Sequence, residues 1–376
     1  VVAQFHEWMT GSGILYLKAK NLPIATVFTT HATVMGRCIA GNGLPLYDNM
    51  AQYDADRCAR EFGVVSRHSL EKSAAKNCDI LTTVSEITAR ECAQFLGREV
   101  DVITPNGFEK SLAPKEAELP AAQAAARKKL LSVASAMSGV KYDDDTLLVG
   151  ISGRYEYKNK GIDVFIDALN RINSSSYAGK KIVAFIMVPG GINGPDKELH
   201  NKLSGAESTY TTLTTHYLME PEYDTIINRL KSLSIKNAPN DRVHLLFAPT
   251  YLNGDDGIFN MKYYDLLVGL DLTLFPSYYE PWGYTPLESL IFSVPTLTTS
   301  YDENYSKGIA IVTRRDSNYD SVVGGVVDRI LEIARLDGEQ KAEYRANAKE
   351  VSNIALWDNN LVYYKQAYTQ AISKLI

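Results

Sequence analysis

The chain has 376 residues, of which 45% are hydrophobic, and its 39 Lys and Arg against 44 Asp and Glu give a net charge of −5. This length predicts two or three domains, each large enough for its own core, and the charge excludes a general attraction to nucleic acid or to anionic membranes. No apolar run approaches the ~20 residues of a membrane-spanning helix, and no signal-peptide pattern opens the chain. The four cysteines lack CxxC spacing, which argues against a zinc site and a disulfide framework, so we expect a soluble, cytoplasmic protein with reduced thiols.

The first third of the chain alternates short apolar runs with amphipathic stretches. Residues 1–5 already resemble a buried strand, from which we expect that an N-terminal part of the same sheet is missing. A helix at 85–96 is predicted to begin after the N-cap residue Ser85 and to stop at Gly97. Strands that alternate with helices predict right-handed βαβ units and a parallel sheet. The predicted strands are 1–5, 25–30, 80–84 and 100–104.

A second series of strands and helices follows an Ala- and Lys-rich helix at 121–129. We expect 132–145 to be weakly structured and place a domain boundary there. The second series implies another lobe with a parallel sheet, and ligands of such sheets bind beyond the carboxyl ends of the strands. Its predicted strands are 147–152, 181–188, 243–247, 272–275 and 296–299, and its predicted helices are 162–172, 223–233, 261–268, 286–292 and three helical patterns from about 321 to 376.

The segment 275–288, Phe-Pro-Ser-Tyr-Tyr-Glu-Pro-Trp-Gly-Tyr-Thr-Pro-Leu-Glu, leaves a predicted strand, turns and enters a helix. Thr285, Pro286 and Glu288 fit a capping box, which offers Glu288 a purely structural role. Glu280 stands in an aromatic, glycine-containing turn, where a carboxylate has no evident part in stabilising the fold. A helix N-terminus at this corner would also present free N–H groups to an anion such as a pyrophosphate.

This segment, with Glu280 and Glu288 eight positions apart, resembles the catalytic segment of the animal and fungal glycogen synthases, glycosyltransferase family three. Three further segments agree with that family in order and spacing, and a fourth also fits, so that the resemblance runs from the first residue to about Tyr364. They are Phe5-His-Glu-Trp8, Phe28-Thr-Thr-His-Ala-Thr33, Gly153-Arg-Tyr-Glu-Tyr-Lys-Asn-Lys-Gly161 and Thr104-Pro-Asn-Gly107.

The resemblance implies an α/β fold of the GT-B type, a pair of Rossmann-type lobes with parallel sheets and a cleft between them. We expect a partial N-terminal lobe on the acceptor side at 1–140, a nucleotide-sugar-binding lobe at 141–350, and a C-terminal helix at 351–376 that packs back on the first lobe. The implied reaction is the retaining transfer of glucose from UDP-glucose to the non-reducing end of an α-1,4-glucan such as glycogen. No metal-binding cluster is visible in the sequence, so we expect transfer without a metal or another cofactor.

The resemblance also assigns roles to particular residues. Arg154 and Lys160 would carry the charge of the diphosphate, for which ordinary surface basicity is the alternative. His6 would contact the transferring glucose, unless it is a buried structural histidine, and Glu280 would lie at the glucosyl carbon, where positive charge develops. The implied substrate contacts are Glu288 at the ribose, the backbone of Trp282 and Gly283 at glucose hydroxyls, Thr285 at the distal phosphate, Asn106, and Tyr251 and Tyr263 around the uracil ring. For these two tyrosines a place in the core is the alternative.

Two features depart from the family. The helix predicted at 338–351 corresponds to the family's arginine-rich helix for glucose 6-phosphate, yet it keeps only Arg345, with Lys341 in place of another arginine, and acids stand where further arginines are expected. Asp271 replaces a histidine of the same effector site, so we expect no appreciable activation by glucose 6-phosphate. Only 190–235 stands in place of the long segment that relatives use for tetramer assembly, which leaves homo-oligomer formation open.

Two other functions stay possible on this sequence. One is a different retaining transferase on the same fold, such as a trehalose-phosphate or sucrose-type synthase, and the other is a catalytically silent glucan-binding relative. A nicotinamide oxidoreductase is disfavoured, because no G-x-G-x-x-G turn with a following acid comes after any predicted strand.

Overall fold

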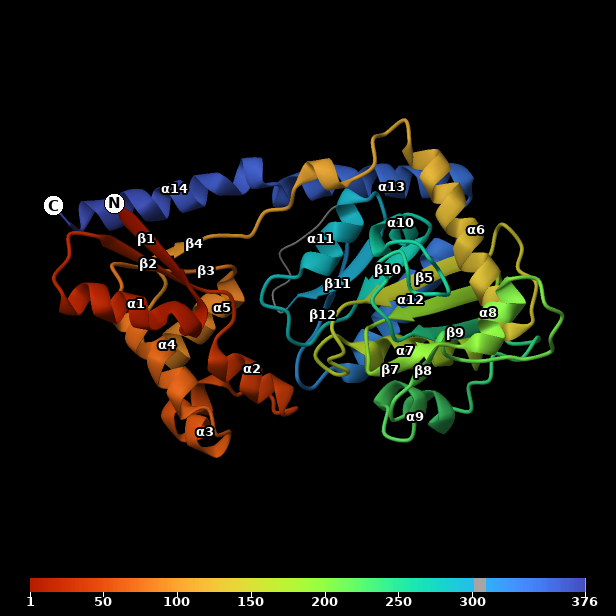
Figure 1. Cartoon of the computed structure of the whole chain (residues 1–376), viewed down its shortest axis with the longest axis horizontal. Coiled ribbons are helices and arrows are strands. Elements are labelled where there is room, and N and C mark those ends of the chain that lie inside the picture. Colours follow the sequence, from red (N-terminus) through yellow and green to blue (C-terminus); the bar gives the residue numbers. More distant parts are fainter. Residues whose placement is uncertain (301–308, 376) are drawn as a thin grey trace. The chain divides into compact units, whose positions relative to one another are not determined.

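The computed structural model describes residues 1–300 and 309–375, and it contains two compact units (Figure 1). Unit 1 comprises Val1–Glu109, Tyr279–Gly283 and Asn353–Ile376, and unit 2 comprises Lys110–Tyr278 and Tyr284–Ser352. Each unit is an α/β structure built around a parallel sheet, as the alternating pattern predicted. No helix within the described residues is long and apolar enough to cross a membrane.

Unit 1 has a four-stranded parallel sheet in the order β1-β2-β3-β4. One face packs against α1 and α4, with Ile14 lying in a cluster with Phe28, Ala74 and Leu81. On the other face the small side chains of Ala367 and Ala371, one helical turn apart, let α14 lie directly on the sheet (Figure 1). The strands are β1 (Val2–His6), β2 (Ala25–Thr30), β3 (Ile80–Thr83) and β4 (Val102–Ile103). The helices are α1 (Glu7–Ala19), α2 (Val34–Gly41), α3 (Ala55–Glu61), α4 (Val65–Asn77), α5 (Glu86–Glu91) and α14 (Trp357–Ser373), with short helical turns at Met50–Gln52, Cys92–Leu96 and Asn353–Ala355.

Unit 2 has a six-stranded parallel sheet in the order β12-β11-β10-β5-β6-β9 and a separate antiparallel pair, β7-β8. The chain therefore winds from β5 outward in one direction and from β10 outward in the other, and the carboxyl ends of these neighbouring strands flank the topological switch point where such sheets bind ligands. The strands are β5 (Leu147–Ser152), β6 (Ile182–Met187), β7 (Ile192–Pro195), β8 (His216–Leu218), β9 (Val243–Ala248), β10 (Leu272–Phe275), β11 (Thr296–Ser300) and β12 (Ala310–Thr313). The helices are α6 (Leu119–Ser138), α7 (Ile162–Asn173), α8 (Lys197–Leu203), α9 (Thr225–Ser232), α10 (Tyr263–Leu267), α11 (Tyr284–Ile291), α12 (Tyr319–Arg335) and α13 (Gly338–Ser352), with a short 3₁₀ turn at Lys110–Leu112.

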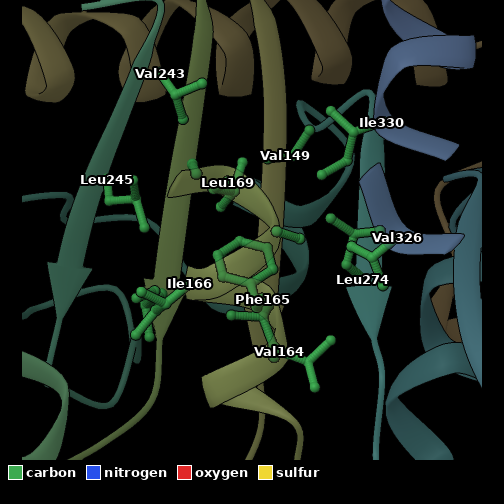
Figure 2. Close-up of a cluster of buried hydrophobic side chains, with 14 of the residues drawn as sticks. Val149, Val164, Phe165, Ile166, Leu169, Val243, Leu245, Leu274, Val326 and Ile330 are labelled. Carbon is green, nitrogen blue, oxygen red and sulfur yellow. The ribbon is translucent and has the colours of Figure 1, made fainter. Parts of the chain in front are cut away.

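The core of unit 2 lies between the sheet and the helices α7 and α12. Figure 2 shows Phe165 and Leu169 of α7 facing the strands, with Ile330 of α12 in the same cluster. These side chains are almost completely buried, and full burial of one such side chain stabilises the fold by roughly 1.5–3 kcal/mol. This core fixes the sheet whose strand ends carry the candidate site.

Two local predictions were wrong. Residues 132–138 are not weakly structured but continue α6 to Ser138, because Val133, Ala134 and Met137 extend its buried face. The helix predicted from 286 begins at Tyr284, so Thr285 lies in the first turn rather than at the cap. The helix predicted at 85–96 is confirmed: Ser85 caps it, it runs as α5 to Glu91 and then as a π turn to Leu96, and Gly97 stops it with a left-handed φ of 65°.

Candidate active site

The predicted site residues belong to both units, and each group is described within its own unit. Unit 1 holds His6, Asn106, Glu280, Trp282 and Gly283. Unit 2 holds Arg154, Lys160, Tyr251, Tyr263, Thr285 and Glu288.

In unit 1, side chains gather at the carboxyl ends of three parallel strands. His6 ends β1, His31 follows β2, and Asn106 follows β4. The Nδ1 atom of His6 lies 3.0 Å from Nε2 of His31, and the two rings are stacked with centroids 5.2 Å apart. The Nδ2 atom of Asn106 lies 3.5 Å from Nδ1 of the same His31. The sheet thus brings the predicted residues His6 and Asn106 together through His31. The sequence analysis had assigned no role to His31.

Both histidines are poised to stay neutral. Burial lowers the pKa of His6, and the neighbouring His31 lowers it further. Burial also lowers the pKa of His31, helped by the positive charge of Arg37. A neutral imidazole offers one donor and one acceptor, which suits contact with sugar hydroxyls. No group of three metal-binding side chains occurs within residues 1–300 and 309–375.

Glu7 is a further member of this cluster that the sequence did not single out. Its backbone has a φ of 64°, which is rare for a residue with a side chain and marks local strain. Its Oε1 atom accepts a hydrogen bond of 2.8 Å from the backbone N–H of His31. The signal was present in the sequence, because Glu7 directly follows His6 in the segment that carried the resemblance.

The segment Tyr279–Gly283, which contains Glu280, is anchored in unit 1 on both sides of that residue. The Tyr279 ring is buried and stacks on Tyr47 with centroids 6.5 Å apart. The Oγ of Ser85 donates a 2.6 Å hydrogen bond to the carbonyl of Pro281. Glu280 itself is half-buried. Its two neighbours in the chain, Tyr279 and Pro281, are held by these contacts, which limits where the Glu280 carboxylate can lie.

Two residues of the same segment show features that suit a binding role. The indole Nε1 of Trp282 is buried without a hydrogen-bond partner in the described part of the chain, which is costly for a donor. Gly283 is buried and has a φ of 90°, which residues with a side chain rarely adopt.

In unit 2, the loop between β5 and α7 touches the chain that leaves β10. A Cβ on Gly161 would lie 2.1 Å from the carbonyl oxygen of Pro276, so only glycine permits this approach, and its φ of 70° is itself left-handed. The carbonyl of Asn159 accepts a 2.8 Å hydrogen bond from the N–H of Tyr278. The loop that carries both predicted phosphate-binding cations is thereby fixed at the switch point of the sheet.

The two predicted cations differ in their surroundings. Arg154 is exposed and forms an ion pair of 2.9 Å with Glu156, which is weak at such an exposed position. Lys160 is half-buried at the end of the same loop, with its backbone N–H bound to the carbonyl of Glu156.

The predicted ribose and uracil contacts lie near the same strand end. The hydroxyl of Tyr263 lies 2.6 Å from Oγ of Ser152, the last residue of β5. The carboxylate of Glu288 accepts a 2.9 Å hydrogen bond from the hydroxyl of Tyr264, and burial raises the pKa of Glu288 while this donor opposes the rise. Tyr251 is 77% exposed. The backbone N–H of Tyr263 donates a 2.9 Å hydrogen bond to the carbonyl of Leu252, the residue that follows Tyr251.

The residues that correspond to the family's effector site form a cluster of ion pairs. Asp271 pairs with Arg127 at 3.0 Å and with Lys341 at 3.1 Å. Although burial raises the pKa of Asp271, these cations hold it below its usual value. Arg345 donates to the carbonyls of Leu270 at 2.6 Å and Ser293 at 3.1 Å. Both remaining cations are therefore committed to neighbours within the unit.

Known proteins resemble this chain over its whole length. A family model described as glycogen synthase matches residues 1–201 and 198–376. The glycogen [starch] synthase isoform 2 of Saccharomyces cerevisiae is 30% identical over 454 aligned residues, which cover 100% of this chain and 64% of that protein. The chain thus spans slightly less than two thirds of the length of this relative.

Solved structures agree in fold. The sucrose-phosphate synthase of Thermosynechococcus elongatus has a TM-score of 0.58 at 16% identity, covering 99% of this chain and 74% of that one. The catalytic domain of starch synthase IV of Arabidopsis thaliana, bound to ADP and acarbose, has a TM-score of 0.57 at 16% identity, covering 99% and 73%. The predicted GT-B fold is thereby confirmed.

Proposed function

Because this chain belongs to the glycogen synthase family, we propose that it transfers glucose from UDP-glucose to the non-reducing end of an α-1,4-glucan with retention of configuration. The observation that carries the proposal is the family match across both units, together with site residues that follow the carboxyl ends of parallel strands. Parallel α/β sheets bind their ligands beyond these ends.

In the proposed reaction, the bond between C1 of glucose and the distal phosphate oxygen breaks, and UDP leaves with the electron pair. Arg154 and Lys160 offset the negative charge that grows on the diphosphate. Glu280 stabilises the positive charge that develops at C1, while a hydroxyl of the acceptor glucan forms the new bond and gives up its proton to a phosphate oxygen of the departing UDP. The predicted lobe at 141–350 holds the nucleotide sugar.

The remaining predicted residues orient the donor. His6 contacts the transferring glucose, and the lowered pKa supports a neutral ring in this role. The backbone of Trp282 and Gly283 holds glucose hydroxyls, and the fixed backbone on both sides of Glu280 supports that assignment. The other assigned contacts are Asn106 at the sugar, Glu288 at the ribose, Thr285 at the distal phosphate, and Tyr251 and Tyr263 at the uracil ring.

The experiment that tests this function measures nucleotide release from UDP-glucose and from ADP-glucose, each with and without glycogen. We expect release of UDP that depends on glycogen and on UDP-glucose. Release with sucrose or trehalose precursors in place of glycogen would favour a different transferase of this fold. Glycogen binding without any release would identify a silent glucan-binding protein and refute the proposal.

A further inference from the structure

A carboxyl group in the interior of unit 1 contacts both the turn that carries His31 and the segment that carries Glu280. Glu91, the last residue of α5, is 0% exposed. Its Oε1 atom is buried without a hydrogen-bond partner in the described part of the chain, while its Oε2 atom has two. Burying an acid in this way costs stability, which calls for a functional reason.

The first contact is to the turn between β2 and α2, which carries His31. The Oγ1 atom of Thr33 accepts a hydrogen bond from the N–H of Gly36 at 2.9 Å, so its own hydrogen is available to Oε2 of Glu91, 2.6 Å away. A Cβ on Gly36 would lie 2.0 Å from that oxygen. The turn is therefore packed directly against the carboxyl group.

The second contact is to the segment Tyr279–Gly283. The hydroxyl of Tyr279, which is 3% exposed, donates to the same Oε2 atom of Glu91 at 3.3 Å. Tyr279 directly precedes Glu280. One oxygen atom thus receives donors from the turn next to His31 and from the segment that holds the proposed catalytic carboxylate.

We infer that Glu91 is a positioning residue: by accepting hydrogen bonds from Thr33 and Tyr279 it fixes the turn and the segment relative to each other, and thereby the positions of His31 and Glu280. This inference rests on the proposed function in so far as Glu280 acts on the donor. Glu91 acts on these two residues through its hydroxyl donors, Thr33 and Tyr279.

This role needs a hydrogen-bond acceptor at Oε2, but it does not need a negative charge on the carboxyl group. Burial raises the pKa of Glu91 to about 7, against the opposing effects of Thr33, Tyr279 and Arg37. Protonation at Oε1 leaves Oε2 free to accept both hydroxyls. An amide oxygen accepts in the same way, so Glu91→Gln preserves the contacts, whereas Glu91→Leu keeps the volume but removes the acceptor.

The test compares Glu91→Gln, Glu91→Leu and Tyr279→Phe with the wild type, and it uses Tyr53→Phe as a matched control. Tyr53 also lies in unit 1 and donates its hydroxyl to a carbonyl, that of Pro45 at 3.0 Å. Hydrogen–deuterium exchange of the peptide that covers 279–283 reports the position of the segment without any need for activity. The values of kcat and KM for UDP-glucose, with glycogen as acceptor, report its consequence.

We expect faster exchange at 279–283 in Tyr279→Phe and Glu91→Leu, together with a kcat that is lower by about ten- to a hundredfold at nearly unchanged KM. Glu91→Gln should restore both, and Tyr53→Phe should change neither. Unchanged exchange in Tyr279→Phe, or a loss in Glu91→Gln equal to that in Glu91→Leu, would overturn the inference. A wild type that shows no transfer would refute the proposed function instead, and the exchange data would still decide the role of Glu91.

Discussion

Glu280 is the residue on which the proposed chemistry depends most. We expect Glu280→Gln to lower kcat by at least about 10²–10³, because the amide cannot offset the charge that develops at the glucosyl carbon. UDP affinity and the melting temperature should stay near those of the wild type, since the segment is also fixed on both sides of Glu280, through Tyr279 and Pro281. Initial rates, calorimetric UDP binding and a thermal melt check this. Near-normal turnover would remove Glu280 from the mechanism.

Glu71 gives a prediction about pH. It is fully buried, its carboxylate accepts from Thr30 and from the N–H of Val34, each at 2.9 Å, and burial raises its pKa to about 8. The folded protein therefore holds a proton that the unfolded chain, with a pKa of about 4.5, has released. Stability is then lost as the pH rises from about 4.5 through 8, by up to about 1.4 kcal/mol per unit.

Glu71→Gln removes this titrating proton, so the free energy of unfolding should fall less steeply with rising pH in the variant than in the wild type. Urea unfolding at pH 6, 7 and 8 measures the free energy of unfolding for both proteins. The histidines, whose pKa values burial lowers, contribute the same slope to both proteins, so their effect cancels in the comparison. Parallel declines in the variant and the wild type would contradict the assignment.

At the scale of elements, the loop between β5 and α7 is sensitive to substitution at Gly161. Gly161→Ala should force the loop away from the carbonyl of Pro276, because the added Cβ would overlap that oxygen and the backbone is left-handed. We expect a loss of stability of about 1–3 kcal/mol and weaker UDP binding, since the same loop carries Arg154 and Lys160. Thermal melting and calorimetry measure the two effects. Gly63→Ala serves as control, because its φ of 68° is equally unusual but no atom lies within 4 Å of the added Cβ.

The helix α13 gives a second prediction at this scale. Because Lys341 is paired with Asp271 and Arg345 is bound to backbone carbonyls, neither is available to a phosphate monoester without breaking these contacts. We therefore expect millimolar glucose 6-phosphate to leave the initial rate with UDP-glucose nearly unchanged. Inorganic phosphate at the same concentration is the control for ionic strength. A rise of several-fold with glucose 6-phosphate alone would contradict this reading.

The sequence predicted helices and strands better than it predicted the tertiary contacts between them. The apolar run 147–152 coincides with β5, since a strand buried on both faces leaves a continuous hydrophobic pattern. Ala310–Thr313 escaped notice because it is short and only half-buried. His31 and Glu91 could not be assigned from local patterns, because their contacts depend on the order of strands in the sheet and on segments nearly 190 residues away in sequence. The predicted domain limits at 140 and 350 stay predictions.

At the scale of the whole molecule, ligand binding should appear as stability. A ligand that binds only the folded protein stabilises it by about 2.7 kcal/mol at a hundredfold excess over Kd. We expect UDP to raise the melting temperature of the wild type and to raise it less in Arg154→Ala and Lys160→Ala. A chelator should change neither the melting temperature nor the transfer rate. Equal shifts in the wild type and both variants would make the two cations ordinary surface residues.

The helix α14 also has a consequence for biosynthesis. It covers the face of the sheet formed by Val27 and Ile80, yet it begins roughly 250 residues after β4 ends. At a translation rate of about 5–20 residues per second, α14 is synthesised on the order of ten to fifty seconds after β4, and this face of the sheet stays uncovered during that time. During that interval the nascent chain exposes an apolar surface beside the ribosome, and we expect a chaperone that recognises such surfaces to accompany unit 1 until α14 emerges.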